Sequence, residues 1–176
     1  MDFTSNYFEL FGLPQSYHVD LKLLADRYHG MQREFHPDRY AGKPAQEQRL
    51  AVQYAAVINQ AYSQLSSPLL RAQYLLSLQN IDDAGDTKIT RDPQFLMQQI
   101  ELREKLADLS DADDAFTALE EVADAVESEY IELQTVFDQQ YSQSRLQEAM
   151  ETVAKMQFFN KLLIEVEQLE HELDDK

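Results

Sequence analysis

The sequence has no cysteine and few of the residues that interrupt helices. Without cysteine the chain can form no disulfide, carries no thiol nucleophile and cannot hold a metal or an iron–sulfur cluster through thiolates. Only four glycines and five prolines occur in 176 residues, whereas leucine, alanine, glutamate and glutamine are plentiful. Long helices with few interruptions are expected, so the predicted fold class is all-α.

Long apolar runs and an amino-terminal targeting signal are also missing. No stretch approaches the roughly 18 consecutive apolar residues that span a bilayer. The segment Met1–Asn6 lacks both the basic residues and the apolar run of a signal peptide. We therefore expect a cytoplasmic protein with no membrane partner.

Positive charge is scarce, and the charges are unevenly distributed. The formal net charge is −17, which argues against nucleic acid and anionic membranes as partners, because both are polyanions bound through clustered lysine and arginine. Residues 1–80 carry seven acidic and seven basic side chains, and residues 81–176 carry the other 25 acids and eight bases. The two segments are expected to have different roles.

The neutral segment begins with two predicted helices. The first is expected to open after Thr4 or Ser5 and to stop at Gly12. The second is expected to start after Asp20, a good N-cap, and to be ended by Pro37. Apolar residues at spacings of three and four give the second helix one buried stripe, formed by Leu21, Leu24, Tyr28, Met31 and Phe35.

Two further helices are predicted in the same segment. Pro44 fits the first position of a third helix that runs toward Ser66, and Pro68 opens a fourth that ends near Asn80. The second and third helices therefore form an antiparallel helical hairpin. The buried stripe predicted for the third helix consists of Leu50, Tyr54, Val57, Ala61 and Leu65.

The acidic segment is predicted to form a three-helix bundle. Residues 80–92 are polar and lack an apolar period, which indicates a linker or exposed loop between a domain at 1–79 and a domain at 93–176. Helices are expected from Pro93, from about Ala112 to Tyr141, and from about Gln143 to Leu173. The stripes of the last two are Phe116, Leu119, Ala123, Val126, Tyr130, Leu133 and Phe137, then Phe159, Leu162, Val166, Leu169 and Leu173.

The tripeptide His36-Pro37-Asp38 lies in the loop of the predicted hairpin. In isolation it could be a helix-stop turn in which Asp38 caps local amides. It could also be a general base oriented by a carboxylate, but such a base needs a pocket, a nucleophile or a metal beside it. The other histidines show no metal-ligand spacing with His36. We therefore expect no catalytic residue, no metal site and no cofactor.

The flanks of this loop carry a resemblance to a known family. Tyr7-Phe8-Glu9-Leu10-Phe11-Gly12-Leu13 is similar to the aromatic opening of a J domain, and the stretches 58–65, 67–68 and 71–74 resemble its third helix and the segment after it. Further along, the stretches 11–14, 71–78, 95–97 and 101–104 resemble the HscB type of J-domain co-chaperone, of the DnaJ superfamily. The likeness covers both halves of the chain.

This resemblance implies a function in iron–sulfur cluster assembly and two partners. One is a specialised DnaK-type, HscA-like chaperone whose ATPase the J domain stimulates as an allosteric ligand, and the other is an IscU-like scaffold protein delivered to that chaperone. The chaperone is expected to bind His36, Pro37 and Asp38. Lys22 is a further positive group nearby, and the rest of the expected chaperone-binding surface is Arg27, Tyr28, Arg33 and Arg39.

The helix that starts at Pro93 carries a second apolar group outside its core stripe. Phe95, Leu102, Leu106 and Leu109 share one narrow stripe, which leaves an apolar patch with carboxylates beside it on the remaining surface. Such a patch is a plausible docking surface. Supported by the resemblance, the expected scaffold-binding residues are Leu96, Met97, Ile100, Glu101, Glu104, Asp108 and Phe158.

Several alternatives stay open at this point. Leu96 and Ile100 could pack against the J domain, and Phe158 could occupy an ordinary position at the edge of the core. The protein could also be a J-domain co-chaperone with a different client, or a non-catalytic acidic helical adaptor.

Overall fold

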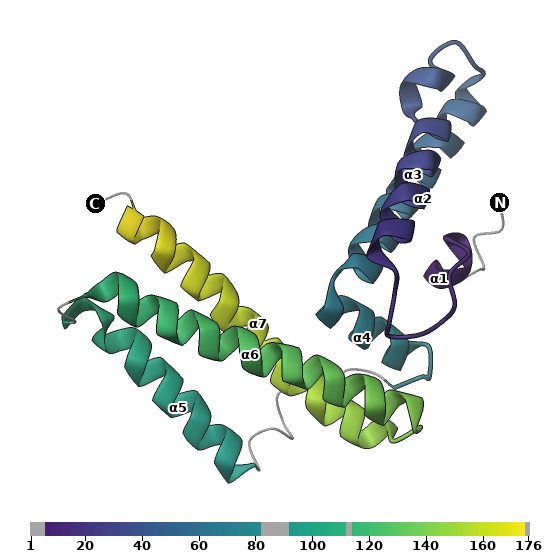
Figure 1. The fold of residues 1–176 in the computed structure, drawn as a ribbon. Helices are drawn as coiled ribbons and strands as arrows, with labels where there is room; N and C mark the ends of the chain where they lie inside the picture. Colours follow the sequence, from purple (N-terminus) through teal and green to yellow (C-terminus); the bar gives the residue numbers. More distant parts are fainter. Residues whose placement is uncertain (1–5, 82–91, 112–113, 175–176) are drawn as a thin grey trace. The chain divides into compact units, whose positions relative to one another are not determined.

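A computed structural model confirms the all-α fold class. It describes residues 6–81, 92–111 and 114–174, and over these ranges every regular element is a helix. The chain divides into two compact units, Met1–Leu78 and Gln79–Lys176, called here the N-terminal and C-terminal units. Figure 1 shows the first unit built from α1 to α4 and the second from α5 to α7.

The N-terminal unit opens with a short helix that is capped at both ends. In α1 (Tyr7–Leu10) the cap is Asn6, whose side chain accepts from the Glu9 N–H, and not Thr4 or Ser5, which lie outside the described residues. Beyond the helix Gly12 adopts φ +60°. The Gly12 N–H donates to Glu9 O and the Leu13 N–H to Phe8 O, the pair of bonds of a Schellman C-cap.

A helical hairpin follows, as predicted. Helix α2 (Leu21–Glu34) begins after Asp20, which accepts from the Leu23 N–H, and α3 (Ala45–Ser66) packs beside it. Pro44 is the cap of α3 and not its first helical residue. Figure 1 shows the turn between them at the end of the pair away from α4 (Pro68–Ser77), a helix that ends earlier than the predicted Asn80.

The core of this unit differs in part from the predicted stripes. Leu24 is the one buried residue of α2, whereas Leu21, at the start of that helix, is half exposed, and Tyr28, Met31 and Phe35 are half-buried. On α3 the buried face includes Ala51 and Ile58 in place of the predicted Leu50 and Val57, and Leu50 lies at the exposed edge. The residues fully buried in this unit include Phe8, Leu24, Ala51, Ile58, Ala61, Leu65, Ala72 and Leu75.

Over residues 92–111 and 114–174, the C-terminal unit forms three long helices and one short one. Helix α5 (Pro93–Ala107) runs into the 3₁₀ helix η3 (Asp108–Asp111), and α6 (Ala115–Ser142) and α7 (Leu146–Asp174) form a hairpin. Ser144, at φ +58°, makes the turn of that hairpin. The Arg145 N–H donates to Gln140 O and the Ser144 N–H to Tyr141 O, again a Schellman pattern.

The predicted bundle stripes are mostly buried, with one error at a helix start. Asp114 caps α6 through the Thr117 N–H, so the helix starts later than the predicted Ala112, which lies outside the described residues. Phe116 is therefore in the first turn and is 53% exposed, not part of the core. Within the described ranges, no helix is long and apolar enough to cross a membrane.

Candidate functional site

The His36-Pro37-Asp38 turn presents its side chains to solvent. Pro37 opens the 3₁₀ helix η1 (Pro37–Tyr40), and His36 is its cap: Nδ1 accepts from the Asp38 N–H at 3.3 Å. Oδ2 of Asp38 lies 3.6 Å from the same nitrogen, and the two side chains are 57% and 91% exposed. The imidazole organises the turn locally, so the Asp38 carboxylate is left available to an approaching partner.

Arg27 and Tyr28, both predicted to bind a chaperone, make contacts inside the N-terminal unit. The guanidinium of Arg27 donates to the carbonyl of Phe11 at the end of α1, where a cation is favourable. The Tyr28 ring stacks on Tyr62 with centroids 4.0 Å apart, and its hydroxyl donates to Asn59 Oδ1 at 3.1 Å. Both residues join neighbouring helices and are only half exposed.

Arg33 and Arg39 lie exposed on either side of the turn. The Nε of Arg33 donates to His29 O at 3.3 Å, and Nη1 of Arg39 donates to Arg33 O at 3.1 Å. Within the described ranges neither guanidinium forms an ion pair. The chaperone contact predicted for Arg33 and Arg39 stays a prediction.

The predicted scaffold-binding residues occupy the solvent side of α5. Met97 and Ile100 are 56% and 51% exposed, and Leu96 is half-buried. Glu101, Glu104 and Asp108 are exposed along the same face. By contrast Phe95, Leu102, Leu106 and Leu109 are buried in the bundle. Helical geometry thus places three apolar and three acidic side chains together outside the core.

Phe158 of α7 lies between core and surface. Its ring meets Phe95 edge-on at 5.5 Å, and the Arg103 guanidinium lies 6.0 Å from its centroid. Phe158 is half-buried, whereas its neighbour Phe159 is 1% exposed. Phe158 therefore borders the α5 surface while Phe159 fills the core.

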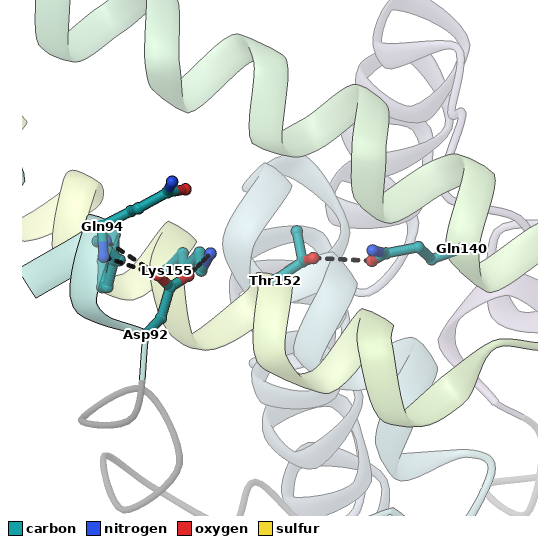
Figure 2. Close-up of polar contacts among 6 residues, drawn as sticks. Asp92, Gln94, Gln140, Thr152 and Lys155 are labelled. Atoms are coloured by element: carbon teal, nitrogen blue, oxygen red, sulfur yellow. Dashed lines mark hydrogen bonds and ion pairs between the residues drawn. The ribbon is translucent and has the colours of Figure 1, made fainter.

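An ion pair that the sequence did not predict joins the start of α5 to α7. Oδ1 of Asp92 accepts from the backbone N–H groups of Gln94 and Phe95, both at 3.1 Å, and Oδ2 lies 2.6 Å from Nζ of Lys155. Figure 2 shows the carboxylate bridging the start of α5 and the side chain of α7. The pattern Asp92-Pro93 indicates a helix cap, but nothing in the sequence indicates a partner 63 residues away.

These contacts also lower the pKa of Asp92. The hydrogen bond from Lys155 has the largest effect, followed by that from the Phe95 N–H. Burial opposes them and is the weaker influence. The described residues contain no group of three or more histidine, cysteine, aspartate or glutamate side chains that could hold a metal ion.

Comparison with known proteins finds relatives that match this chain over nearly its whole length. The chain is 41% identical over 170 residues to a co-chaperone protein HscB homolog of Photobacterium profundum, covering 97% of this chain and 99% of the relative. It is equally similar, at 41% over 170 residues, to co-chaperone protein HscB of Proteus mirabilis, covering 97% and 98%. Residues 91–167 match the family described as HSCB C-terminal oligomerisation domain.

Solved structures give the same result. Chaperone HscB from Vibrio cholerae superposes with a TM-score of 0.87 at 40% identity, covering 96% of this chain and 99% of that one. Human co-chaperone protein HscB superposes with a TM-score of 0.89 at 30% identity, covering 97% and 84%. The similarity therefore extends over both units.

Proposed function

The chain belongs to the HscB family of co-chaperones, and from this membership we propose that it stimulates the ATPase of an HscA-like, DnaK-type chaperone and delivers an IscU-like scaffold protein to it. The family's role in iron–sulfur cluster maturation would then be this protein's role. A co-chaperone regulates another protein, so the chain itself is expected to catalyse no reaction. A cytoplasmic location belongs to the same proposal and can be tested by cell fractionation.

The observation that carries the proposal is the exposed His36-Pro37-Asp38 turn at the end of the α2–α3 hairpin. A rigid proline, a capped backbone and an exposed carboxylate give a small, preorganised surface for a chaperone. Such a ligand shifts the chaperone toward hydrolysis only if it binds the active conformation more tightly. Arg33 and Arg39 would add charge complementarity to an acidic chaperone surface.

The second half of the proposal concerns the scaffold protein. The exposed apolar side chains Leu96, Met97 and Ile100, with the acidic residues and Phe158 around them, form a surface on the C-terminal unit. Bringing the client and the chaperone to one molecule raises their effective concentration. The chaperone and the scaffold protein need not already be bound to each other for this effect.

A pair of variants tests the two halves separately. Chaperone ATPase should rise with the wild-type protein and should fail to rise with His36→Gln, which keeps a polar side chain at the cap. A Leu96/Met97/Ile100 triple alanine variant should keep the ATPase stimulation and lose scaffold binding. No stimulation by the wild type on any DnaK-type chaperone would refute the co-chaperone proposal, and stimulation without scaffold binding would indicate a J protein with a different client.

A further inference from the structure

A groove lies beside the predicted scaffold-binding surface, where the start of α5 meets α6 and α7. Its volume is about 610 Å³. Phe95 and Phe159 are buried in its floor, and Leu133 of α6 lines it while half-buried. Met97 and Glu101 of α5 line it as well. Polar side chains line the groove beside these apolar ones, namely Asp92, Gln94, Gln98, Glu101, Glu129 and Lys155.

The charges in this groove do not cancel. Lys155, the one cation among the described residues that line it, already pairs with Asp92 at 2.6 Å, and Nζ lies 5.2 Å from the centre of the Phe95 ring. Glu101 and Glu129 also line the groove, and within the described ranges neither forms an ion pair. The groove thus holds two carboxylates without an ion pair beside the apolar side chains of Phe95, Leu133 and Phe159.

This combination suits one kind of side chain. Lysine and arginine have an apolar stem that packs on hydrocarbon and a cationic end that needs acceptors. An aliphatic side chain would leave both carboxylates without a partner, and an acidic one would be repelled. The complementary ligand is a basic side chain that projects from a protein surface.

The groove is continuous with the surface already assigned to the client. Met97 and Glu101 belong both to the groove and to the predicted scaffold-binding set. We propose that the groove receives one lysine or arginine side chain of the scaffold protein, which makes Glu129 and Leu133 of α6 scaffold-binding residues. The inference rests on the proposed function and extends client recognition from α5 onto α6.

Glu129→Gln is the direct test, since it removes the charge and keeps the shape. The dissociation constant of this variant for the purified scaffold protein should be about five-fold larger than that of the wild type. Its affinity should also depend less steeply on salt, because one ion pair is lost. Glu129→Lys should weaken binding more strongly by placing two cations together.

Glu127→Gln is the matched control. Glu127 is exposed on the same helix but points away from Glu129, since two residues correspond to about 200° of rotation. It carries the same charge change and should bind the scaffold like the wild type. Thermal unfolding of both variants checks that the bundle is intact.

The outcomes separate the groove from the wider proposal. If Glu129→Gln binds like Glu127→Gln while the Leu96/Met97/Ile100 triple variant loses binding, the groove inference is wrong and the client surface stands. If the triple variant binds normally, the α5 assignment itself is wrong. A scaffold lysine or arginine whose change to glutamate restores binding to Glu129→Lys would identify the occupant.

Discussion

Nζ of Lys155 lies 2.6 Å from Oδ2 of Asp92, so one ion pair joins α7 to the N-cap of α5. Asp92→Asn should keep the cap, because asparagine caps as well as aspartate, but should lose the ion pair. Asp92→Ala should lose both. The melting temperature is therefore expected to fall from wild type to Asn to Ala, and Lys155→Met should resemble Asp92→Asn. Equal melting temperatures for wild type and Asp92→Ala would contradict a stabilising role.

The same pair predicts a pH dependence. The Lys155 ammonium, and then the Phe95 N–H, hold the pKa of Asp92 below its ordinary value of 3.8. A lowered pKa in the folded state means that the stabilisation is fully present above pH 3.8 and is lost as the pH falls through the lowered value. Urea unfolding should thus give a constant difference between wild type and Asp92→Asn near neutral pH. The difference should shrink under strongly acidic conditions, and a difference that grows there would contradict the prediction.

Replacing Gly12 by alanine is predicted to destabilise the protein. Its φ is +60°, and a Cβ there would lie 2.8 Å from Nη1 of Arg27, which donates to the Phe11 carbonyl. Gly12→Ala should therefore strain the backbone and displace the arginine, at a cost of about 1–2 kcal/mol in the free energy of unfolding. Chemical denaturation of the full chain measures this.

Gly30 provides the control for that substitution. It lies inside α2, and a Cβ there would meet nothing within 4 Å. Gly30→Ala should stabilise the protein by up to about 1 kcal/mol, since alanine favours helix more than glycine does. If both substitutions had the same sign, the Arg27 contact would not explain the requirement at Gly12.

Gly12 and Arg27 illustrate what the sequence could and could not predict. Local patterns predicted the cap Asp20, the start of α4 at Pro68 and the stop at Gly12, because such signals act over one helical turn. The contact of Arg27 with Phe11 joins α2 to the end of α1 and was not predicted, whereas the chaperone contact predicted for Arg27 stays a prediction. Its position in space follows from packing, which no local period encodes.

Phe116 and Leu119 of α6 should respond very differently to truncation. Both belonged to one predicted stripe, yet Phe116 is 53% exposed and Leu119 is 1% exposed. Leu119→Ala should cost about 2–5 kcal/mol through lost burial and the cavity left behind. Phe116→Ala should change the free energy of unfolding by less than about 1 kcal/mol. Comparable losses would mean that Phe116 is covered in solution.

The error at Phe116 has the same origin as that at Leu21, since both residues lie in the first turn of a helix. Periodicity gives the angle of a side chain around its helix but not where the neighbouring helix begins or ends. Residues in a first turn, or at the edge of a stripe, can have the right angle and still lack a neighbour. On α5 the same reasoning separated core from surface, since Phe95, Leu102 and Leu106 of the predicted core stripe are buried while Met97 and Ile100 are exposed.

Alanine variants of Phe158 and Phe159 separate an effect on binding from an effect on stability. The two residues are the same type and adjacent on α7, but their side chains point in different directions. Phe159 is 1% exposed, and Phe159→Ala should cost about 3–5 kcal/mol in the free energy of unfolding. Phe158 is half-buried, with one edge contact to Phe95 and the Arg103 guanidinium near its ring. Phe158→Ala should cost less stability.

The binding measurement then decides what Phe158 does. If it belongs to the client surface, Phe158→Ala should weaken scaffold binding about ten-fold or more, as truncation of an aromatic interface residue does. ATPase stimulation in the absence of scaffold should stay at the wild-type level, because the His36 turn is unaltered. Phe158→Leu should restore part of the affinity by refilling the contact with Phe95. Unchanged scaffold affinity together with a loss of stability would instead make Phe158 an edge-of-core residue and would confine the client surface to α5 and the groove beside it.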